Sequence, residues 1–351
     1  MICFIWDGFP QYAARCVGNL VAQINETVVV VATRPKVPIQ GMDRLAKCRV
    51  VWIDVSESRS LQQIVGEWPR ILFVSGWGNQ IINRLRDGAR AAGVRIAAMC
   101  DNNFNFTVKE FAKAILFRFL YRNKFDAYLV PGESSRRLLR FYGVSDTRIF
   151  TGLYAADDSL FHDGKPLLDR PKQLIFVGQL CERKNVLRLA STFVMANSRK
   201  EWKLIFYGCG PLEQNLKYYA QRFGQGMIDV NPFMQPEELA QKYRESRIFC
   251  LPSIEEHWGV VVHEAALSGC ILLLSRDVGA KDDFLIGGVN GSTFASRSSR
   301  SMLKSMLMCM SFDGDKMWKA HDASIKKSAL ASTTRFSVSV KEIIRLLSDV
   351  Q

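Results

Sequence analysis

Short β-branched and aliphatic runs alternate with helix-like segments along the whole chain. Such alternation is typical of parallel sheets whose strands are joined by crossover helices. In the first half the strand-like runs are 2–6, 27–32, 50–53, 71–75, 95–99 and 127–130, with a short one at 149–151. In the second half they are 173–177, 203–207, 228–230, 248–251 and 271–274. The sequence therefore predicts an α/β protein.

The chain has 351 residues, which is too long for one ordinary core and fits two domains. Residues 155–172 are polar and are the best candidate for a linker between them. We expect a first doubly wound, Rossmann-like domain over 1–160 and a second over 170–335, facing each other across a cleft. An amphipathic helix is expected over 336–351, and the first domain is its candidate partner.

The nine cysteines are scattered, odd in number and without a Cys-x-x-Cys pair, so free thiols in a reducing compartment explain them best. Residues 1–8 are apolar but run directly into Asp7-Gly8 with no basic segment before them, which favours a first strand over a signal peptide. No apolar run approaches membrane-spanning length. A cytoplasmic protein is expected.

The formal net charge of +13 is concentrated in the first half, where residues 1–150 hold 21 Lys and Arg against 12 Asp and Glu, a net charge of +9. Within it, residues 109–125 place Phe111, Ile115, Leu116 and Phe119 at helical spacing among several cations. Two interpretations are open: a helix packed on its own sheet with a solvated basic face, or a face that touches the anionic inner surface of a membrane. No RNA-binding aromatic signature or zinc finger points to nucleic acid.

Two glutamates, Glu256 and Glu264, are separated by seven residues at the end of one strand-like run and the start of an alanine-rich helix. Ligands of open α/β sheets bind where strands end and helices begin. A helix N-terminus there offers free N–H groups to an anion. Carboxylates that accept hydrogen bonds from hydroxyls, beside amides that hold phosphate, suit a sugar nucleotide.

Three further strand ends carry residues that suit the same ligand. Gly178-Gln179 is followed by the cations around Lys184, and a second strand ends in Gly208-Cys209-Gly210. A third strand ends before Phe233-Met234, which could clamp a base. Taken singly, each of these strand ends is equally well explained as an ordinary turn or as a loop held by a buried side chain.

In order and spacing, these four segments resemble the retaining glycosyltransferases of family 4, which have the two-domain GT-B fold. The resemblance covers about residues 170–295, while residues 1–165 match only in outline. The matching stretches are Phe176-Val177-Gly178-Gln179-Leu180 with Lys184, Tyr207-Gly208-Cys209-Gly210-Pro211-Leu212, Pro232-Phe233 with Pro236-Glu237-Glu238-Leu239, and Pro252-Ser253 with Glu256-His257-Trp258-Gly259 and Glu264-Ala265, extended by Val278-Gly279-Ala280 and Asn290-Gly291.

The resemblance implies a role for each donor-side position. Lys184 would bind the donor diphosphate, Glu256 would face the donor sugar, and Glu264 would bind the ribose hydroxyls. Gln179 stands where an arginine often accompanies the lysine, so positive charge is lower there, although a glutamine can still donate a hydrogen bond. The remaining donor-side positions act through their backbone: Gly178, Gly208, Phe233 and Met234, and the amides of Trp258, Gly259 and Val260.

The acceptor-side positions follow strands of the first half. Gly8 lies where the family has a glycine-rich loop, and Trp77 could form an acceptor wall or simply pack. Many relatives carry a histidine near the anomeric centre at this point of the first half. All four histidines of this chain lie beyond residue 160, so Asp101 is the candidate to take its place, with Asn102 beside it. Alternatively, Asp101 caps the following segment.

The sequence gives no sign of a metal site or cofactor. His257 and His263 lack a third ligand at metal-site spacing, and Asp313-Gly314-Asp315 follows a helix-like stretch and is best explained as a surface turn. The resemblance implies a metal-independent, retaining hexosyltransferase. Its co-substrate would be a UDP- or GDP-linked sugar, and its acceptor a saccharide or lipid-linked saccharide of surface polysaccharide or glycolipid synthesis. Two alternatives remain open: a catalytically silent nucleotide-sugar-binding subunit, and an epimerase or phosphorylase of the same fold.

Overall fold

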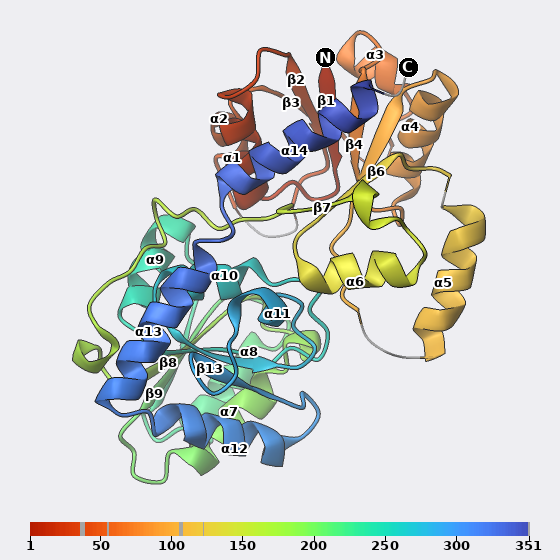
Figure 1. Ribbon diagram of the computed structural model, residues 1–351. Coiled ribbons are helices and arrows are strands. Elements are labelled where there is room, and N and C mark those ends of the chain that lie inside the picture. Colours follow the sequence, from red (N-terminus) through yellow and green to blue (C-terminus); the bar gives the residue numbers. More distant parts are fainter. Residues whose placement is uncertain (36–38, 55, 105–107, 122, 350–351) are drawn as a thin grey trace. The chain divides into compact units, whose positions relative to one another are not determined.

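The computed structural model describes residues 1–351 except 36–38, 55, 105–107, 122 and 350–351. The chain forms two compact units (Figure 1), of which the first comprises Met1–Ala155 and Ala331–Gln351 and the second Ala156–Leu330. Each unit has a parallel sheet with helices packed on it, as the alternating sequence pattern predicts. Apart from one-residue shifts at five ends of four strands, all the predicted strands are present.

The first sheet has seven parallel strands in the order β3-β2-β1-β4-β5-β6-β7. Its order reverses between β1 and β4, which is the point where open α/β sheets bind ligands. The strands are β1 (Ile2–Trp6), β2 (Val28–Ala32), β3 (Arg49–Trp52), β4 (Ile71–Ser75), β5 (Arg95–Met99), β6 (Ala127–Val130) and β7 (Ile149–Thr151). The helices before β7 are α1 (Gln11–Val21), α2 (Met42–Ala46), α3 (Leu61–Val65), α4 (Gln80–Ala91), α5 (Val108–Leu120) and α6 (Glu133–Phe141).

Both faces of the first sheet are covered, because alternate residues of each strand point to opposite sides. In β1, Ile2, Phe4 and Trp6 join a core with α1 and the C-terminal helix α14 (Thr333–Ser348). Cys3 and Ile5 join the opposite core, which α3, α4, α5 and α6 cover. The C-terminal helix therefore belongs to the first unit, where its apolar face is buried through Phe336, Val340, Ile343 and Leu347.

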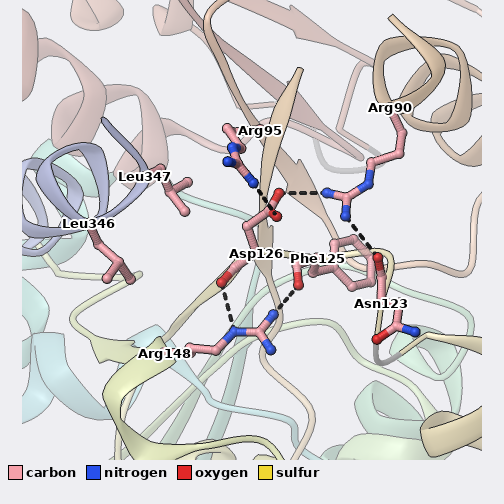
Figure 2. Close-up of a pocket in the computed structure, with 8 residues that line it drawn as sticks. All are labelled: Arg90, Arg95, Asn123, Phe125, Asp126, Arg148, Leu346 and Leu347. Atoms are coloured by element: carbon pink, nitrogen blue, oxygen red, sulfur yellow. Dashed lines mark hydrogen bonds and ion pairs between the residues drawn. The ribbon is translucent and has the colours of Figure 1, made fainter. Parts of the chain in front are cut away.

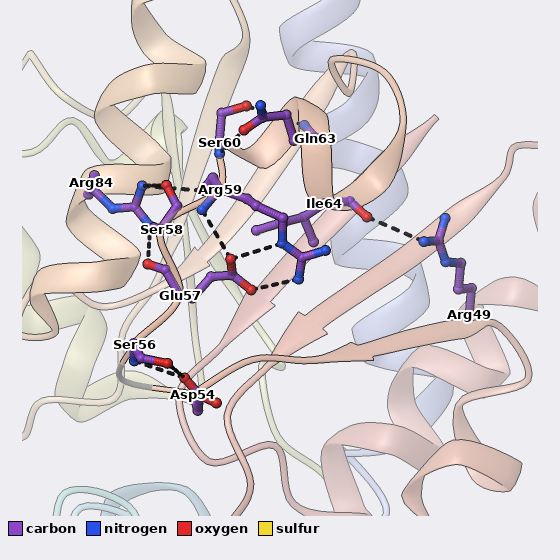
Figure 3. Close-up of polar contacts among 10 residues, drawn as sticks. All are labelled: Arg49, Asp54, Ser56, Glu57, Ser58, Arg59, Ser60, Gln63, Ile64 and Arg84. Atoms are coloured by element: carbon purple, nitrogen blue, oxygen red, sulfur yellow. Dashed lines mark hydrogen bonds and ion pairs between the residues drawn. The ribbon is translucent and has the colours of Figure 1, made fainter.

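Polar contacts hold the connection from β3 to α3 (Figure 3). The Glu57 carboxylate accepts hydrogen bonds from the Arg59 side chain at 2.7 and 3.0 Å. These bonds from a guanidinium lower the pKa of Glu57 to about 2. Helix α3 then begins with a capping box, in which Ser60 accepts from the Gln63 amide and the Gln63 side chain accepts from the Ser60 amide.

The second sheet has six parallel strands in the order β10-β9-β8-β11-β12-β13, with its reversal between β8 and β11. The strands are β8 (Gln173–Val177), β9 (Lys203–Tyr207), β10 (Ile228–Asn231), β11 (Ile248–Leu251), β12 (Ile271–Ser275) and β13 (Gly291–Phe294). The helices are α7 (Val186–Ala196), α8 (Glu213–Phe223), α9 (Pro236–Arg244), α10 (Val260–Leu267), α11 (Lys281–Phe284), α12 (Ser299–Met310) and α13 (Gly314–Ser328).

The segment 155–172, expected as a linker, lies in the second unit from Ala156 onward. Arg170 is buried, and its guanidinium donates to the carbonyl oxygens of Lys165 (2.7 Å), Ser246 (3.0 Å) and Ser268 (2.9 Å). A buried guanidinium with that many partners fixes the segment against the second sheet.

Helix α5 does not pack as the first of the two interpretations of residues 109–125 predicts. The residues expected to pack on the sheet, Phe111, Ile115, Leu116 and Phe119, are all exposed. Ala114 and Phe117 are the side chains buried in the core instead. The interpretation in which this apolar row packs on its own sheet is therefore wrong for these four residues.

Candidate functional site

The ends of β8 and β9 are joined backbone to backbone. The Gly178 amide donates to Tyr207 O (3.1 Å) and the Leu180 amide to Cys209 O (2.9 Å). A Cβ on Gly208 would lie 1.9 Å from Gly178 O, and one on Gly210 would lie 2.5 Å from Leu180 O. Only glycine permits such an approach at these two positions. The two corners therefore present a strip of backbone at the carboxyl edge of the sheet.

Lys184 is positioned by a short 3₁₀ turn over Glu182–Lys184 that follows the β8 corner. The next residue, Asn185, has a left-handed backbone with φ of 57°. Its side-chain amide donates to Pro252 O (3.2 Å) after β11 and to Ser296 O (2.8 Å) after β13. Asn185 thus ties three strand ends together and fixes the base of the lysine side chain.

The structure brings Lys184 and Glu256 together as an ion pair. The Lys184 side chain is buried, and the same Glu256 oxygen accepts from the Ser253 hydroxyl at 3.0 Å. Arg183 approaches this oxygen at 3.6 Å and donates to the Glu255 carbonyl at 2.7 Å. One carboxylate therefore faces two cations and a hydroxyl in the loop between β11 and α10.

Helix α10 begins at Val260, directly after Gly259, whose φ is 93°. The Val262 amide donates back to Gly259 O at 2.9 Å. Gly259 has no side chain that could accept from the amides of Val260 and Val261, and such N–H groups at the start of a helix suit an anion. The Trp258 side chain is buried against Phe284, with ring centroids 5.8 Å apart. Trp258 can therefore serve a ligand through its backbone and not its ring.

Glu264 lies one turn into α10 and accepts a hydrogen bond from the Tyr243 hydroxyl of α9 at 2.9 Å. Burial raises the pKa of the Glu264 carboxyl to about 7, while the bond from Tyr243 opposes the rise. Burial raises the pKa of Tyr243 well above its ordinary value, and the Glu264 carboxylate adds to the rise because it disfavours a phenolate. Tyr243 therefore remains a donor that orients Glu264.

The donor-side positions separate into two groups. Lys184 and Glu256 are in direct contact, whereas within the described part of the chain no hydrogen bond or ion pair joins Glu264 to either of them. Gln179 is exposed beside the β8 corner, and Phe233 and Met234 follow β10 with half-buried side chains. All of these positions follow carboxyl ends of strands in one sheet.

In the first unit, the acceptor-side positions also follow strand ends. Gly8 has φ of 67° and its amide donates to the Thr33 hydroxyl at 2.8 Å. Asp101 follows β5, with the Tyr154 hydroxyl 3.4 Å from its carboxylate, and Asn102 is exposed. The Trp77 ring packs against Phe117 and Tyr121 of the α5 region, with centroids 5.4 and 5.7 Å apart.

The sequence did not single out Arg183, Asn185 or Tyr243, which support the two glutamates and the lysine. Arg183 and Asn185 adjoin Lys184 in sequence, and a cation beside a candidate phosphate ligand was a signal that could have identified Arg183. Tyr243 carried no such signal, because it lies 21 residues from Glu264 on another helix. No role was predicted for Ser253, which donates a hydrogen bond to Glu256.

The histidines and the Asp-x-Asp sequence have structural partners. The buried His263 ring accepts from the Ala156 amide (2.9 Å) and donates to Ser328 O (3.0 Å). Asp313 caps α13 by accepting from the Lys316 amide. Among the described residues, no group of three or more His, Cys, Asp or Glu side chains could hold a metal ion.

A cavity of about 440 Å³ lies at the amino ends of strands in the first sheet, opposite the carboxyl ends that carry the acceptor-side positions (Figure 2). Its arginines hold the start of β6: Arg90 donates to Asp126 (2.6 Å) and Asn123 O (2.9 Å), and Arg148 donates to Asp126 O (2.8 Å). Because the cavity is at the amino ends of β5, β6 and β7, it is not where an open α/β sheet binds its ligand.

Comparisons with known proteins match part of the chain to a family. Residues 158–313 match the family described as glycosyl transferases group 1. An uncharacterized glycosyltransferase of Methanocaldococcus jannaschii is 26% identical over 124 residues, which are 35% of this chain and 32% of that protein. The match therefore spans about a third of this relative's length.

Two solved structures resemble the whole chain. HepE of Anabaena, in complex with UDP and glucose, has a TM-score of 0.75 at 13% identity, covering 98% of this chain and 99% of that one. Sucrose-phosphate synthase of Thermosynechococcus elongatus has a TM-score of 0.73 at 13% identity and covers all of both chains. The predicted fold is confirmed: the chain has the GT-B fold. Within it, residues 158–313, which hold Lys184, Glu256 and Glu264, match the group 1 glycosyl transferases.

Proposed function

We propose that this chain is a retaining, metal-independent glycosyltransferase that uses a UDP- or GDP-linked hexose. Its acceptor would be a saccharide or lipid-linked saccharide of surface polysaccharide or glycolipid synthesis. The observation that carries the proposal is the buried Lys184–Glu256 pair at the carboxyl edge of the second sheet, inside the segment that matches the family. The complex of HepE with UDP and glucose supports a nucleotide sugar as the donor.

Donor binding would exchange the partners of this pair. A buried ammonium or carboxylate left without a partner is costly, so Lys184 and Glu256 neutralise each other through their ion pair. The donor offers a diphosphate to Lys184 and sugar hydroxyls to Glu256. Both charged groups then keep a partner, and the donor gains two charge-assisted contacts that hold the sugar and the leaving group in register.

The chemical step follows from the same groups. The acceptor oxygen bonds to the anomeric carbon as the bond from that carbon to the diphosphate oxygen breaks, on the same face of the sugar. The acceptor proton passes to the departing phosphate oxygen. Lys184, Arg183 and the first amides of α10 stabilise the negative charge that develops there.

A panel of UDP-, GDP- and ADP-linked sugars, screened by calorimetry and then by transfer assays, tests the proposal. Lys184→Ala should lower kcat/KM for transfer by about 100-fold, because one donor to a developing charge is removed. Glu264→Ala should also lower it, mainly through donor affinity. Lys217→Ala is the matched control, because Lys217 pairs with Glu213 on the surface of α8.

Two outcomes would contradict the proposal. Transfer that is undiminished in Lys184→Ala and Glu264→Ala would remove the assigned site. Tight nucleotide-sugar binding without turnover on broad acceptor mixtures would point to a silent binding subunit. The anomeric configuration of the product, read by NMR, tests retention, and full activity in the presence of a chelator tests metal independence.

A further inference from the structure

Helix α5 lies at the right margin of the first unit in Figure 1. It exposes a row of large apolar side chains. Phe119 is 85% exposed, Ile115 60%, Leu116 54%, Leu120 50% and Phe111 48%. Scattered single apolar side chains are normal on a protein surface, but a contiguous patch marks an interaction site. Five such residues on one 13-residue helix form such a patch.

The row occupies one side of the helix. At about 100° per residue, the five positions together with Ala112 span an arc of about 180°. The opposite side carries Ala114 and Phe117, which are buried in the first unit's core. Helix α5 is therefore anchored through one face and offers the other to solvent.

Cations border the apolar arc, and Glu110, the acidic residue of α5, lies on the opposite side of the helix. Lys113 lies at one border, with its side chain 63% exposed, and Arg118 at the other. Glu110 is buried, where its carboxylate accepts from the Tyr142 hydroxyl (2.8 Å) and from Lys113 (2.9 Å). Lys124 follows the helix, with its ammonium over the Tyr121 ring. The exposed side of α5 is therefore apolar at its centre and positive at its margins.

We propose that α5 is an interfacial helix that docks on an anionic lipid surface. An apolar face that enters the boundary between headgroups and acyl chains, with cations at its edges, is the arrangement that lies in the plane of a membrane. Long cationic side chains can bury their stems while their charged ends reach lipid phosphates. The +9 net charge of residues 1–150 adds attraction to the same surface.

Charge decides between a membrane and a second copy of the chain. Two α5 faces brought together would oppose their own bordering cations, whereas an anionic bilayer complements them. Helix α5 has 13 residues, fewer than the roughly 20 needed to cross a bilayer. In the described part of the chain, no helix combines the length and hydropathy of a membrane span. The helix would therefore lie on the membrane surface.

Vesicle flotation with the full chain tests docking without any assay of activity, so its result is independent of the proposed function. The probes are vesicles of equimolar phosphatidylcholine and phosphatidylglycerol, and vesicles of phosphatidylcholine alone. We expect binding to the anionic vesicles that weakens with added salt. Ile115→Ser/Phe119→Ser should weaken that binding at least tenfold, because two exposed side chains that would enter the bilayer are lost.

The matched control is Met195→Ser/Trp318→Ser, which removes two side chains of similar exposure, 62% and 67%, from the second unit and should bind as the wild type does. Lys113→Gln/Arg118→Gln should weaken binding to the anionic vesicles by about fivefold per cation and leave binding to phosphatidylcholine unchanged. Far-UV circular dichroism checks that each variant is folded.

The proposal is overturned if the wild type does not float with anionic vesicles, or if the α5 and control variants bind alike. It is also overturned if the wild type is a dimer without lipid and Ile115→Ser/Phe119→Ser makes it a monomer. In that case the row is an interface between copies. Capture of an acidic protein by α5 with no lipid binding would likewise refute it.

Discussion

At the scale of single residues, the proposed role of Glu264 in donor binding makes that binding depend on pH. Its pKa is raised to about 7, so it carries a proton below that pH and loses an acceptor site for the ribose hydroxyls. We expect the donor KM to rise about tenfold when the pH falls from about 8 to about 6. In Glu264→Gln the donor KM should be high and nearly constant over this range. Equal pH profiles for wild type and variant would show that another group titrates.

Arg183 is the second residue whose contribution can be measured. Its guanidinium lies 3.6 Å from the Glu256 oxygen that pairs with Lys184, so it can supply the cation that Gln179 does not. Arg183→Gln should raise the donor KM about fivefold to tenfold, a modest loss because the side chain is 42% exposed.

A rescue variant tests whether Arg183 acts through its charge. Adding Gln179→Arg to Arg183→Gln should recover most of the donor affinity, because the new arginine restores a positive charge in the same loop after β8. Arg222→Gln, on α8, is the control. If Arg183→Gln leaves the donor KM unchanged, or if the second substitution recovers nothing, Arg183 only holds the Glu255 loop.

At the scale of elements, the sequence predicted most strands because buried parallel strands are continuous apolar runs. It missed β13, whose residues Gly291-Ser292-Thr293-Phe294 contain no such run. It left the packing face of α5 open, and the interpretation in which Phe119 faces the sheet is the wrong one. Both sides of that helix carry apolar residues, and spacing alone does not show whether Phe117 or Phe119 faces the sheet.

The candidate site was predictable for a related reason. Residues that follow parallel strands meet at one edge, so Lys184 and Glu256 could be brought together from sequence, 72 residues apart. Partners that come from the middle of a helix have no such rule, which is why Tyr243 was not anticipated.

The corner between β8 and β9 supports a prediction about stability. In Gly208→Ala the new Cβ would lie 1.9 Å from Gly178 O, so the two corners must separate. We expect a loss of about 2–4 kcal/mol in the free energy of unfolding, measured with urea. The control is Gly226→Ala, which has a positive φ of 76° but nothing within 4 Å of the new Cβ, and should lose about 1 kcal/mol. Equal losses in the two variants would contradict the steric argument.

At the scale of the whole molecule, the chain passes between its two units twice, after Ala155 and after Leu330. One side chain bonds to both connections. His263, next to Glu264 in α10, accepts from the Ala156 amide and donates to Ser328 O. Helix α10 therefore holds both segments of the second unit that lead to the first. Both bonds require a neutral ring with its proton on Nε2.

Burial lowers the pKa of His263 to about 4, so protonation favours the unfolded chain, where the value is near 6.5. The contribution of His263 to stability is therefore present above about pH 6.5 and is lost as the pH falls toward 4. We expect the wild type to lose about 2 kcal/mol more than His263→Gln between about pH 8 and pH 5, measured by urea unfolding. The glutamine variant keeps a neutral amide that can donate to Ser328 O, and exposed His162→Gln serves as the control. Parallel pH profiles for wild type and His263→Gln would mean that the neutral ring does not hold the two connections.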